Sequence, residues 1–462
     1  MTSLTKNNTQ HLKHSHSIPL ITCTIFCATI FIPRLHFGTV AVGFDDFLAA
    51  LFFLPMVCYS LMNPNSVIFK GKACFMLVLW ISIIITGIIF GIWASCYHLD
   101  RVHFPTEMWQ YIKRMVFFYL TLYLAYTQSI SPKYFLRMIT FILIVALLVG
   151  IFQILPISIG EHLSSLYARN DRQLERLIHR SFAMKRVYGV AGFSTAWGGF
   201  SMFAVSVGLA LLLPETKVCG FMAWTLLILA TINVFFSGSR VSIVTACTLI
   251  PVTAFLFFRL SKSRKKYLFL LKSLCGTLLI GFSAIYFLSE RINFILFRFQ
   301  VLLTTQGGSR TEQISQAVNL LNNWITCLIG VGNATQRQLA ISHGAEVEPV
   351  YLLVNYGILG LFLRYGILLL IFFYAFRLAK ISSGENKILA LASILSIVGY
   401  AIFSLGYFFF QELYVGLLPW LLFGWTAGTY FRLDNFLKMY RGTPTLPNNE
   451  ALNSTGLLNH GE

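Results

Sequence analysis

The chain has 462 residues, of which 56% are hydrophobic and only 11% are charged. This composition excludes a soluble globular protein, because apolar runs of about 20 residues, the length that a helix needs to cross a bilayer, recur many times. The formal net charge of +18 would favour nucleic acid as the partner of a soluble protein, but in a membrane protein basic residues gather in cytoplasmic loops, so no nucleic-acid partner is expected.

The apolar runs extend along almost the whole chain. They predict an all-α polytopic membrane protein with about twelve transmembrane helices. We expect a tail at 1–17, a transmembrane domain over 18–431, and a second tail at 432–462 whose end is disordered. The predicted spans lie near residues 18–33, 44–62, 73–94, 112–130, 135–156, 197–214, 218–236, 241–258, 267–288, 349–376, 387–406 and 413–431.

Basic residues indicate the orientation of these spans. If the N-terminus is inside, the predicted inner connections carry lysine or arginine, as the positive-inside rule requires of cytoplasmic loops. Both termini are therefore predicted to be cytoplasmic. The residues concerned are Lys70, Lys72, Lys133, Arg137, Lys217, Arg259, Lys262, Arg264, Lys265, Lys266, Arg377, Lys380, Lys387, Arg432, Lys438 and Arg441.

Asp45 and Asp46 stand at the predicted outer end of the second span. A pair of carboxylates is favourable at a helix N-terminus, where it meets the positive end of the helix dipole. No further acidic residue lies nearby in the sequence to complete an acidic metal motif. We therefore interpret the pair as a feature of the helix start and expect no metal.

Two sizeable segments are predicted on the outer side, at 157–196 and 289–348. An outer loop of fewer than about 60 residues usually avoids an excess of basic residues, yet the first segment has one. It is either a solvated, partly helical hairpin or part of a site for an anionic substrate, because arginine forks match phosphate oxygens. Its basic residues are Arg169, Arg172, Arg176, Arg180, Lys185 and Arg186.

The second outer segment contains apolar residues at helical spacing. They predict an amphipathic helix that lies on the membrane surface or against the bundle and that ends at Gly330 and Gly332. Arg310 precedes this helix. The apolar residues concerned are Ile314, Val318, Leu321, Ile325 and Leu328.

An arginine stands between two apolar runs in FFSGSRVSIVTA, residues 235–246. A charged side chain within a span costs about 2.5–3.5 kcal/mol on insertion scales. Arg240 follows a Ser-Gly-Ser turn that includes Ser239, and a helix would not continue through such a turn. Arg240 either reaches the membrane interface alone or belongs to a site.

Four stretches of the chain, in this order, resemble motifs of the O-antigen polymerase and O-antigen ligase superfamily. FSGSRVSIV at 236–244 is similar to its Ser-x-Ser-Arg signature, and RVYGVAGFSTAWGGF at 186–200 to an Arg-x-x-Gly segment that opens a span. GGSRTEQ at 307–313 with LIGVGN at 328–333 resembles an outer helix and its Gly-x-Gly exit, and EPVYLLVNYGILGLF at 348–362 resembles a re-entry span. The resemblance extends from about Arg186 to Phe362.

The resemblance implies glycan transfer from a polyprenyl diphosphate on the outer face of the bacterial inner membrane. It implies no cofactor, nucleotide sugar or metal. The phosphate-binding arginines of the family map onto Arg240, Arg310 and Arg186, and Ser239 would join them. Such a transfer needs fixed cations beside the leaving diphosphate and a base beside the acceptor hydroxyl.

The resemblance departs from the ligase branch at one position. Ligases begin the re-entry span with a histidine, and alignment on Tyr356, Gly357 and Gly360 places Glu346 there, with His343 three residues earlier. This favours the polymerase branch and makes Glu346 and His343 the candidate bases. Each could instead be an ordinary surface residue, and Glu348 is expected to be solvated.

These features predict a polymerase that joins undecaprenyl-diphosphate-linked oligosaccharide repeat units into O-antigen or a related surface polysaccharide. Two alternatives remain open: an O-antigen ligase that joins polymer to lipid A core, and a flippase or transporter of the lipid-linked oligosaccharide. The expected partners are the lipid-linked glycan and membrane lipid. A chain-length regulator and a flippase are further candidates.

Overall fold

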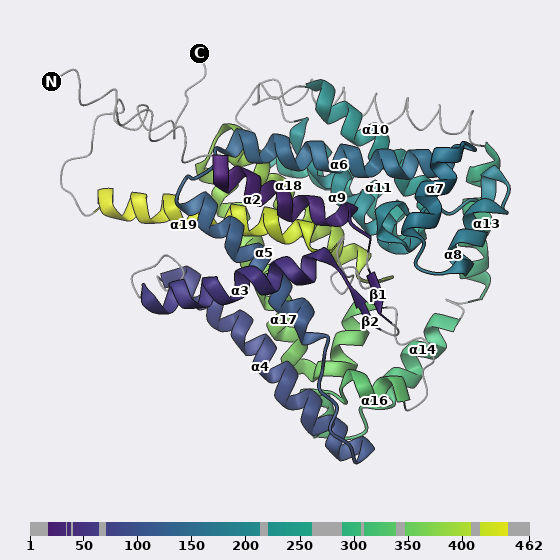
Figure 1. Ribbon diagram of the computed structural model, residues 1–462, viewed down its shortest axis with the longest axis horizontal. Coiled ribbons are helices and arrows are strands. Elements are labelled where there is room, and N and C mark those ends of the chain that lie inside the picture. Colours follow the sequence, from purple (N-terminus) through teal and green to yellow (C-terminus); the bar gives the residue numbers. More distant parts are fainter. Residues whose placement is uncertain are drawn as a thin grey trace.

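The computed structural model describes residues 17–33, 35–37, 40–63, 71–212, 220–260, 289–305, 309–338, 347–407 and 416–441. Helices dominate this part of the chain (Figure 1). The one small sheet described is an antiparallel hairpin of β1 (Leu35–Phe37) and β2 (Val40–Val42). The helices are α2 (Ser17–Ala28), η1 (Thr29–Phe31), α3 (Phe44–Met62), α4 (Gly71–Leu99), α5 (Met108–Tyr126), α6 (Pro132–Ile154), α7 (Ser158–Tyr167), α8 (Asp171–Ile178), η3 (Phe182–Met184), η4 (Gly189–Ala191), α9 (Ser194–Leu211), α10 (Gly220–Ser237), α11 (Arg240–Leu260), α13 (Ser289–Thr304), α14 (Ser309–Val318), α15 (Trp324–Ile329), α16 (Asn333–Gln338), α17 (Glu348–Ile381), α18 (Gly384–Phe403) and α19 (Leu418–Arg441).

Seven of the described helices are long and apolar enough to cross a membrane. They are α4, α6, α9, α10, α11, α17 and α18. The prediction of an all-α membrane protein is therefore confirmed, whereas the number of twelve spans stays a prediction. The remaining predicted spans overlap the shorter apolar helix Ile18–Phe31 and the helices α3, α5 and α19, except for 267–288, which lies outside the described residues.

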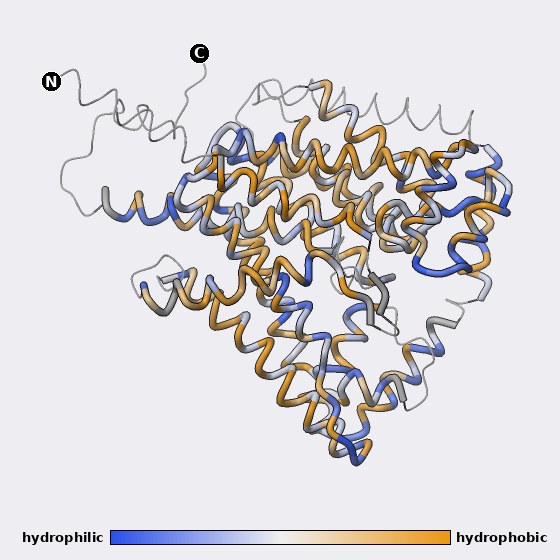
Figure 2. Tube along the Cα trace, viewed as in Figure 1, coloured by the Kyte–Doolittle hydropathy of each residue, from blue (hydrophilic) through white to orange (hydrophobic). Residues whose placement is uncertain are grey.

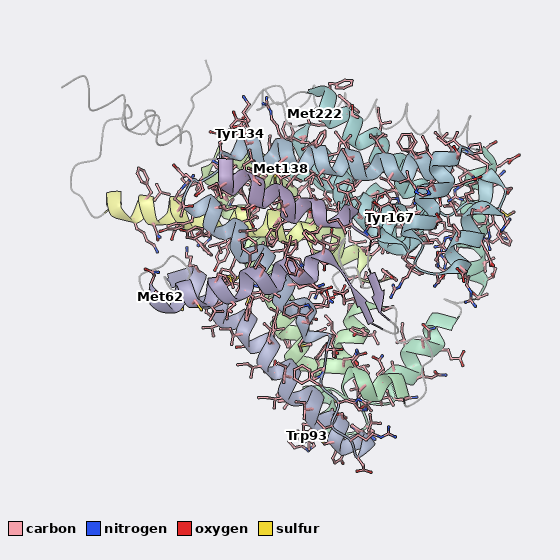
Figure 3. All side chains as sticks on the ribbon, in the orientation of Figure 1. Met62, Trp93, Tyr134, Met138, Tyr167 and Met222 are labelled. Atoms are coloured by element: carbon pink, nitrogen blue, oxygen red, sulfur yellow. The ribbon has the colours of Figure 1, made fainter. Side chains whose placement is uncertain are left out.

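The ends of the helices separate along one diagonal of the molecule. Tyr134, Met222 and Met62, which the sequence assigns to inner ends, lie at the upper left, the top and the left, whereas Trp93 and Tyr167, assigned to the outer side, lie at the bottom and right of centre (Figure 3). Hydrophilic segments are seen at the right around α7 and α8 and at the lower tip where α4 ends (Figure 2). The alternation of the predicted spans and the side that is cytoplasmic stay predictions.

Helix α9 forms the centre of the bundle. It packs against α10, α11 and α18, and 94% of its residues in the apolar window are buried inside the protein. A Cβ on Gly208 would lie 2.7 Å from Cγ of Leu227, so this glycine allows α9 and α10 to approach closely. Small residues serve this purpose in membrane bundles, where packing rather than the hydrophobic effect holds helices together.

Helices α5 and α19 are held together in the same way. Gly424 and Gly428 lie one turn apart on α19, and a Cβ on either would lie within 2.2 Å of a backbone oxygen of α5, at Phe118 or Leu122. The backbones therefore touch along a Gly-x-x-x-Gly face, a common membrane packing motif.

The prediction of one continuous amphipathic helix between Ile314 and Leu328 is wrong. The chain leaves the helical conformation after Val318 and starts again at Trp324, giving α14 and α15. Asn323 causes the restart, because its side chain accepts from the Thr326 amide at 2.9 Å while the Thr326 hydroxyl accepts from the Asn323 amide. This reciprocal capping stabilises a new helix N-terminus. The predicted end of the helix at Gly330 is confirmed, since this residue has a φ of +80°.

Candidate functional site

The Ser-Gly-Ser turn separates α10 from α11, as the sequence predicts. Gly238 adopts a φ of +61°, which disfavours any residue with a Cβ, and α11 begins at Arg240. The Ser239 amide donates to Oγ of Ser237 at 3.2 Å, and the Ser242 amide donates to Oγ of Ser239 at 3.4 Å. Ser239 thus caps α11 and is buried.

Helix α9 supports this turn from inside the bundle. A Cβ on Gly198 would lie 2.2 Å from Oγ of Ser242 and 2.9 Å from Oγ of Ser237. Only a glycine at this position lets the turn sit directly against the helix backbone. Helix α9 therefore supports the turn through Gly198.

Four arginines converge on the turn, and we call them the turn arginine cluster: Arg186, Arg240, Arg291 and Arg298. Arg186 Nε donates to the Ser237 carbonyl at 3.4 Å, and Nη1 of Arg298 donates to the Gly238 carbonyl. Arg291 Nη2 donates to the carbonyls of Phe235 at 2.8 Å and Phe236 at 3.2 Å. Arg240 Nη1 donates to the Arg298 carbonyl at 2.7 Å, which attaches α11 to α13.

Arg186 is positioned by the strand-like segment that precedes α9. The Val187 amide donates to the Phe236 carbonyl at 2.9 Å, so this segment runs beside the end of α10. Gln153 of α6 then fixes Gly189 from both sides, accepting from its amide at 2.8 Å and donating to its carbonyl at 3.2 Å. Arg186 is therefore held by a buried backbone and not by a loose loop.

Arg291 and Arg298 were not predicted from the sequence. They lie seven residues apart on α13, which places them on one face two turns apart. Arg291 is 1% exposed, and its guanidinium lies 5.2 Å from the ring centre of Phe236. Burial and the neighbouring Arg298 lower the pKa of Arg291 to about 10. A negatively charged group at the cluster would relieve both effects.

The structure describes some of the predicted site residues and not others. It brings Arg240, Arg186 and Ser239 together at one turn. Arg310 lies in the first turn of α14, and its side chain is outside what the structure describes. Glu346 and His343 lie outside the described residues.

The re-entry span α17 is broken at Gly357, which has a φ of 65° and a ψ of −172°. The chain after α15 occupies the break: the Val331 amide donates to the Val354 carbonyl at 2.8 Å, and the Gly332 amide donates to the Asn355 carbonyl at 3.2 Å. These bonds satisfy carbonyls that the interrupted helix leaves without an internal donor. The LIGVGN and NYG motifs are therefore two halves of one structural unit.

Glu348 begins α17 and contacts the turn at 404–406 that follows α18. It is 1% exposed, so the expectation that it is solvated is wrong. Its amide donates to the Ser404 carbonyl at 3.0 Å, and a Cβ on Gly406 would lie 3.0 Å from Cβ of Val241, the residue after Arg240. The turn at 404–406 thus contacts both the start of α17 and the start of α11.

No group of three or more His, Cys, Asp or Glu side chains that could hold a metal ion occurs in the described part of the chain. The cationic character of the turn favours an anionic ligand held by guanidinium groups instead. The chain matches no family model, and no curated protein matches it.

Proposed function

We propose that the protein is a membrane glycosyltransferase that polymerises undecaprenyl-diphosphate-linked oligosaccharide repeat units into O-antigen or a related surface polysaccharide. The reaction takes place on the periplasmic side of the bacterial inner membrane, and both termini of the chain are cytoplasmic. It uses no metal or other cofactor. The membrane presents the lipid-linked glycan, and a flippase and a chain-length regulator are the proposed partners.

The observation that carries this proposal is the turn arginine cluster. In the reaction, the bond between the anomeric carbon and the diphosphate oxygen of the donor breaks, and a bond to an acceptor hydroxyl oxygen forms. The leaving diphosphate keeps the electron pair and becomes more negative. Guanidinium groups that are already fixed in place stabilise this developing charge without reorganising, and arginine stays charged while binding two oxygens at once.

The location of the cluster suits a donor that stays in the membrane. Arg240 and Arg186 are half-buried, and most of α11 faces outward from the bundle. A polyprenyl chain could then lie against α11 while its diphosphate reaches the start of that helix. A soluble donor would not need a cationic group at the end of an outward-facing span.

The acceptor hydroxyl must lose a proton, and Glu346 or His343 is the proposed base. Glu346 precedes Glu348 by two residues, so their Cα atoms are at most about 7 Å apart. Glu348 and Val241, the residue after Arg240, contact the same turn at 404–406, which supports a role for the acidic start of α17 beside Arg240. Arg310 is proposed as a further diphosphate ligand from α14.

The test is deletion of the gene in its host, followed by electrophoresis of the surface lipopolysaccharide. A polymerase predicts loss of the polymer ladder with retention of a band of core plus one repeat unit. Bare core with polymer accumulating on the lipid carrier would identify a ligase instead. Bare core with single lipid-linked units trapped on the inner side would identify a flippase, and either result would overturn the proposal.

A further inference from the structure

A second group of buried arginines lies apart from the turn arginine cluster. Arg114 of α5 and Arg364 of α17 border a cavity of about 30 Å³ between α4, α5, α17 and α19. Trp80, Tyr111, Glu348 and Trp420 also line it, together with aliphatic side chains. Arg114 is 1% exposed and Arg364 is 7% exposed, so both residues are buried.

Both guanidiniums lie close to the ring of Tyr111. The guanidinium carbons of Arg114 and Arg364 lie 5.0 Å and 4.6 Å from the ring centre of Tyr111. Arg364 Nε donates to Oη of Tyr111 at 2.6 Å, and its Nη1 donates to the Gly360 carbonyl at 3.2 Å. The hydrogen bonds hold Arg364 in place, and both arginines border the cavity.

Several hydrogen-bond donors around the cavity are not satisfied by the described protein atoms. They are Nε and Nη2 of Arg114, Nη2 of Arg364 and Nε1 of Trp80. A buried donor without an acceptor costs about 1–3 kcal/mol, and more when the group is charged. Since arginine and tryptophan can only donate, the group that satisfies them must accept.

The charge of the lining also favours an anion. It holds two guanidiniums and one carboxylate, Glu348, so one positive charge is in excess. Lys113 is adjacent in sequence to Arg114 but lies outside the lining, and its ammonium group is bound by Asp45 at 2.5 Å and Asp46 at 2.7 Å. Those two carboxylates are therefore committed to Lys113.

The size of the cavity limits its occupant. A volume of 30 Å³ holds roughly two water molecules or one small ion. Water brings two hydrogens that need acceptors, and the Glu348 carboxylate is the one charged acceptor in the lining, whereas a halide only accepts and also neutralises the excess charge. We propose that this cavity binds a single small inorganic anion of the size of chloride, coordinated by Arg114, Arg364 and Trp80.

The bound anion connects the two halves of the broken span. Glu348 and Leu352 precede the break at Gly357, Arg364 follows it, and all three border the cavity. An anion held by Arg364 and by Arg114 of α5 therefore fixes the bent shape of α17 against its neighbour. The site does not depend on the glycosyl transfer proposed above.

The test uses the full chain in detergent micelles, with thermal unfolding in sodium chloride and in sodium gluconate at equal ionic strength. We expect chloride to raise the Tm by several degrees in a saturable manner and gluconate to leave it unchanged. Arg364→Gln should abolish the chloride effect. Arg432→Gln should keep it, because Arg432 lies on α19 outside the lining and donates to the Ala125 carbonyl at 3.3 Å.

Equal Tm values in the two salts, or an unchanged chloride effect in Arg364→Gln, would overturn the proposal. If Arg364→Gln does not fold, bromide replaces chloride in crystals of the unmodified protein. Anomalous density between Arg114 and Arg364 supports the site. Density for water alone in the cavity overturns it.

Discussion

Lys113 Nζ lies 2.5 Å from Oδ2 of Asp45, although 68 residues separate the two in the sequence. Both side chains are buried, and Asp46 accepts from the same ammonium group at 2.7 Å. Asp46 also accepts from the indole of Trp109 at 2.9 Å. Thus Asp45 and Asp46 begin α3, as the sequence predicts, and also neutralise a lysine on α5 that would otherwise be costly at this depth.

We expect Lys113→Met to destabilise the protein by about 3–5 kcal/mol, because it leaves the buried Asp45 and the half-buried Asp46 without their cation. The measurement is the free energy of unfolding in mixed micelles. The double variant Lys113→Met with Asp45→Asn should recover part of the loss. As a control, Lys438→Met should cost less than about 1 kcal/mol, since Lys438 is 66% exposed where it contacts Asp434. Equal losses of unfolding free energy in Lys113→Met and Lys438→Met would contradict the role of Lys113 as the buried partner of Asp45 and Asp46.

Arg240→Ala is expected to abolish polymer while the protein stays folded. The change removes a half-buried guanidinium of the turn arginine cluster but leaves the cap of α11, Ser239, intact. The measurement is the lipopolysaccharide ladder of a deletion strain that carries the variant, with an immunoblot for protein level. Arg259→Ala, at the exposed far end of the same helix, should restore a normal ladder. A normal ladder from Arg240→Ala at equal expression would remove Arg240 from the site.

Gly238→Ala keeps every charge of the turn arginine cluster and changes only its geometry. A Cβ on Gly238 would lie 3.2 Å from Nη1 of Arg298, 3.3 Å from Nη2 of Arg291 and 3.4 Å from Cγ of Arg186. We expect a loss of about 1–2 kcal/mol from the positive φ and a shortened or absent ladder because the guanidiniums are pushed apart. Gly366→Ala, where a Cβ meets open space, is the matched control. Wild-type polymer from Gly238→Ala would show that the spacing of the arginines is unimportant.

Gly357→Ala should harm folding more than Gly238→Ala does. Its backbone conformation is essentially restricted to glycine, and a Cβ would lie 2.2 Å from the Leu328 carbonyl atoms, which cannot rotate away. We expect a loss of about 3 kcal/mol or more, visible as a low yield of monodisperse protein and a lowered Tm. Gly366→Ala, nine residues further along α17, serves again as the control. A Tm within a degree of wild type would mean that the span straightens without cost.

Asp434 should contribute a pH-dependent part of the stability. Partial burial raises the pKa of its carboxyl, but hydrogen bonds from Lys72 and Lys438 outweigh this effect and lower the pKa below the usual value. The stabilisation is therefore complete above the unfolded pKa of about 3.9 and is lost as the pH falls through the lower folded pKa. The Tm difference between wild type and Asp434→Asn should be constant near neutral pH and should shrink below about pH 4. A difference that does not change with pH would contradict this.

The sequence predicted the parts of the fold that depend on local signals. The start of α11 at Arg240 follows from a glycine turn between two apolar runs, and the end of α15 at Gly330 follows from a residue that tolerates positive φ. Both features depend only on residues that are close together in the sequence. Hydropathy likewise located α4, α6 and α17 to within a few residues, because the length of an apolar run reflects the bilayer thickness.

Contacts between distant segments could not be predicted in the same way. Arg291 and Arg298 join the cluster only because α13 packs beside the end of α10, and hydropathy says nothing about which helices are neighbours. The burial of Glu348 depends on α5 and α18, both far from it in sequence. The break after Val318 was missed because apolar periodicity continued through Asn323, whose cap outweighs it.

Helix α9 shows that a membrane helix need not meet lipid. Its mean hydropathy of 1.3 is the lowest among the seven candidate spans of the described chain, and it is also the most buried of them. Because its neighbours are other helices, it can carry Gly198 and serine hydroxyls at a depth where lipid would exclude them. The neighbouring helices surround α9 and separate its glycines and hydroxyl groups from the hydrocarbon of the membrane. Evolution can therefore change the chemistry at the turn by substitutions on α9 that leave the lipid-facing surface untouched.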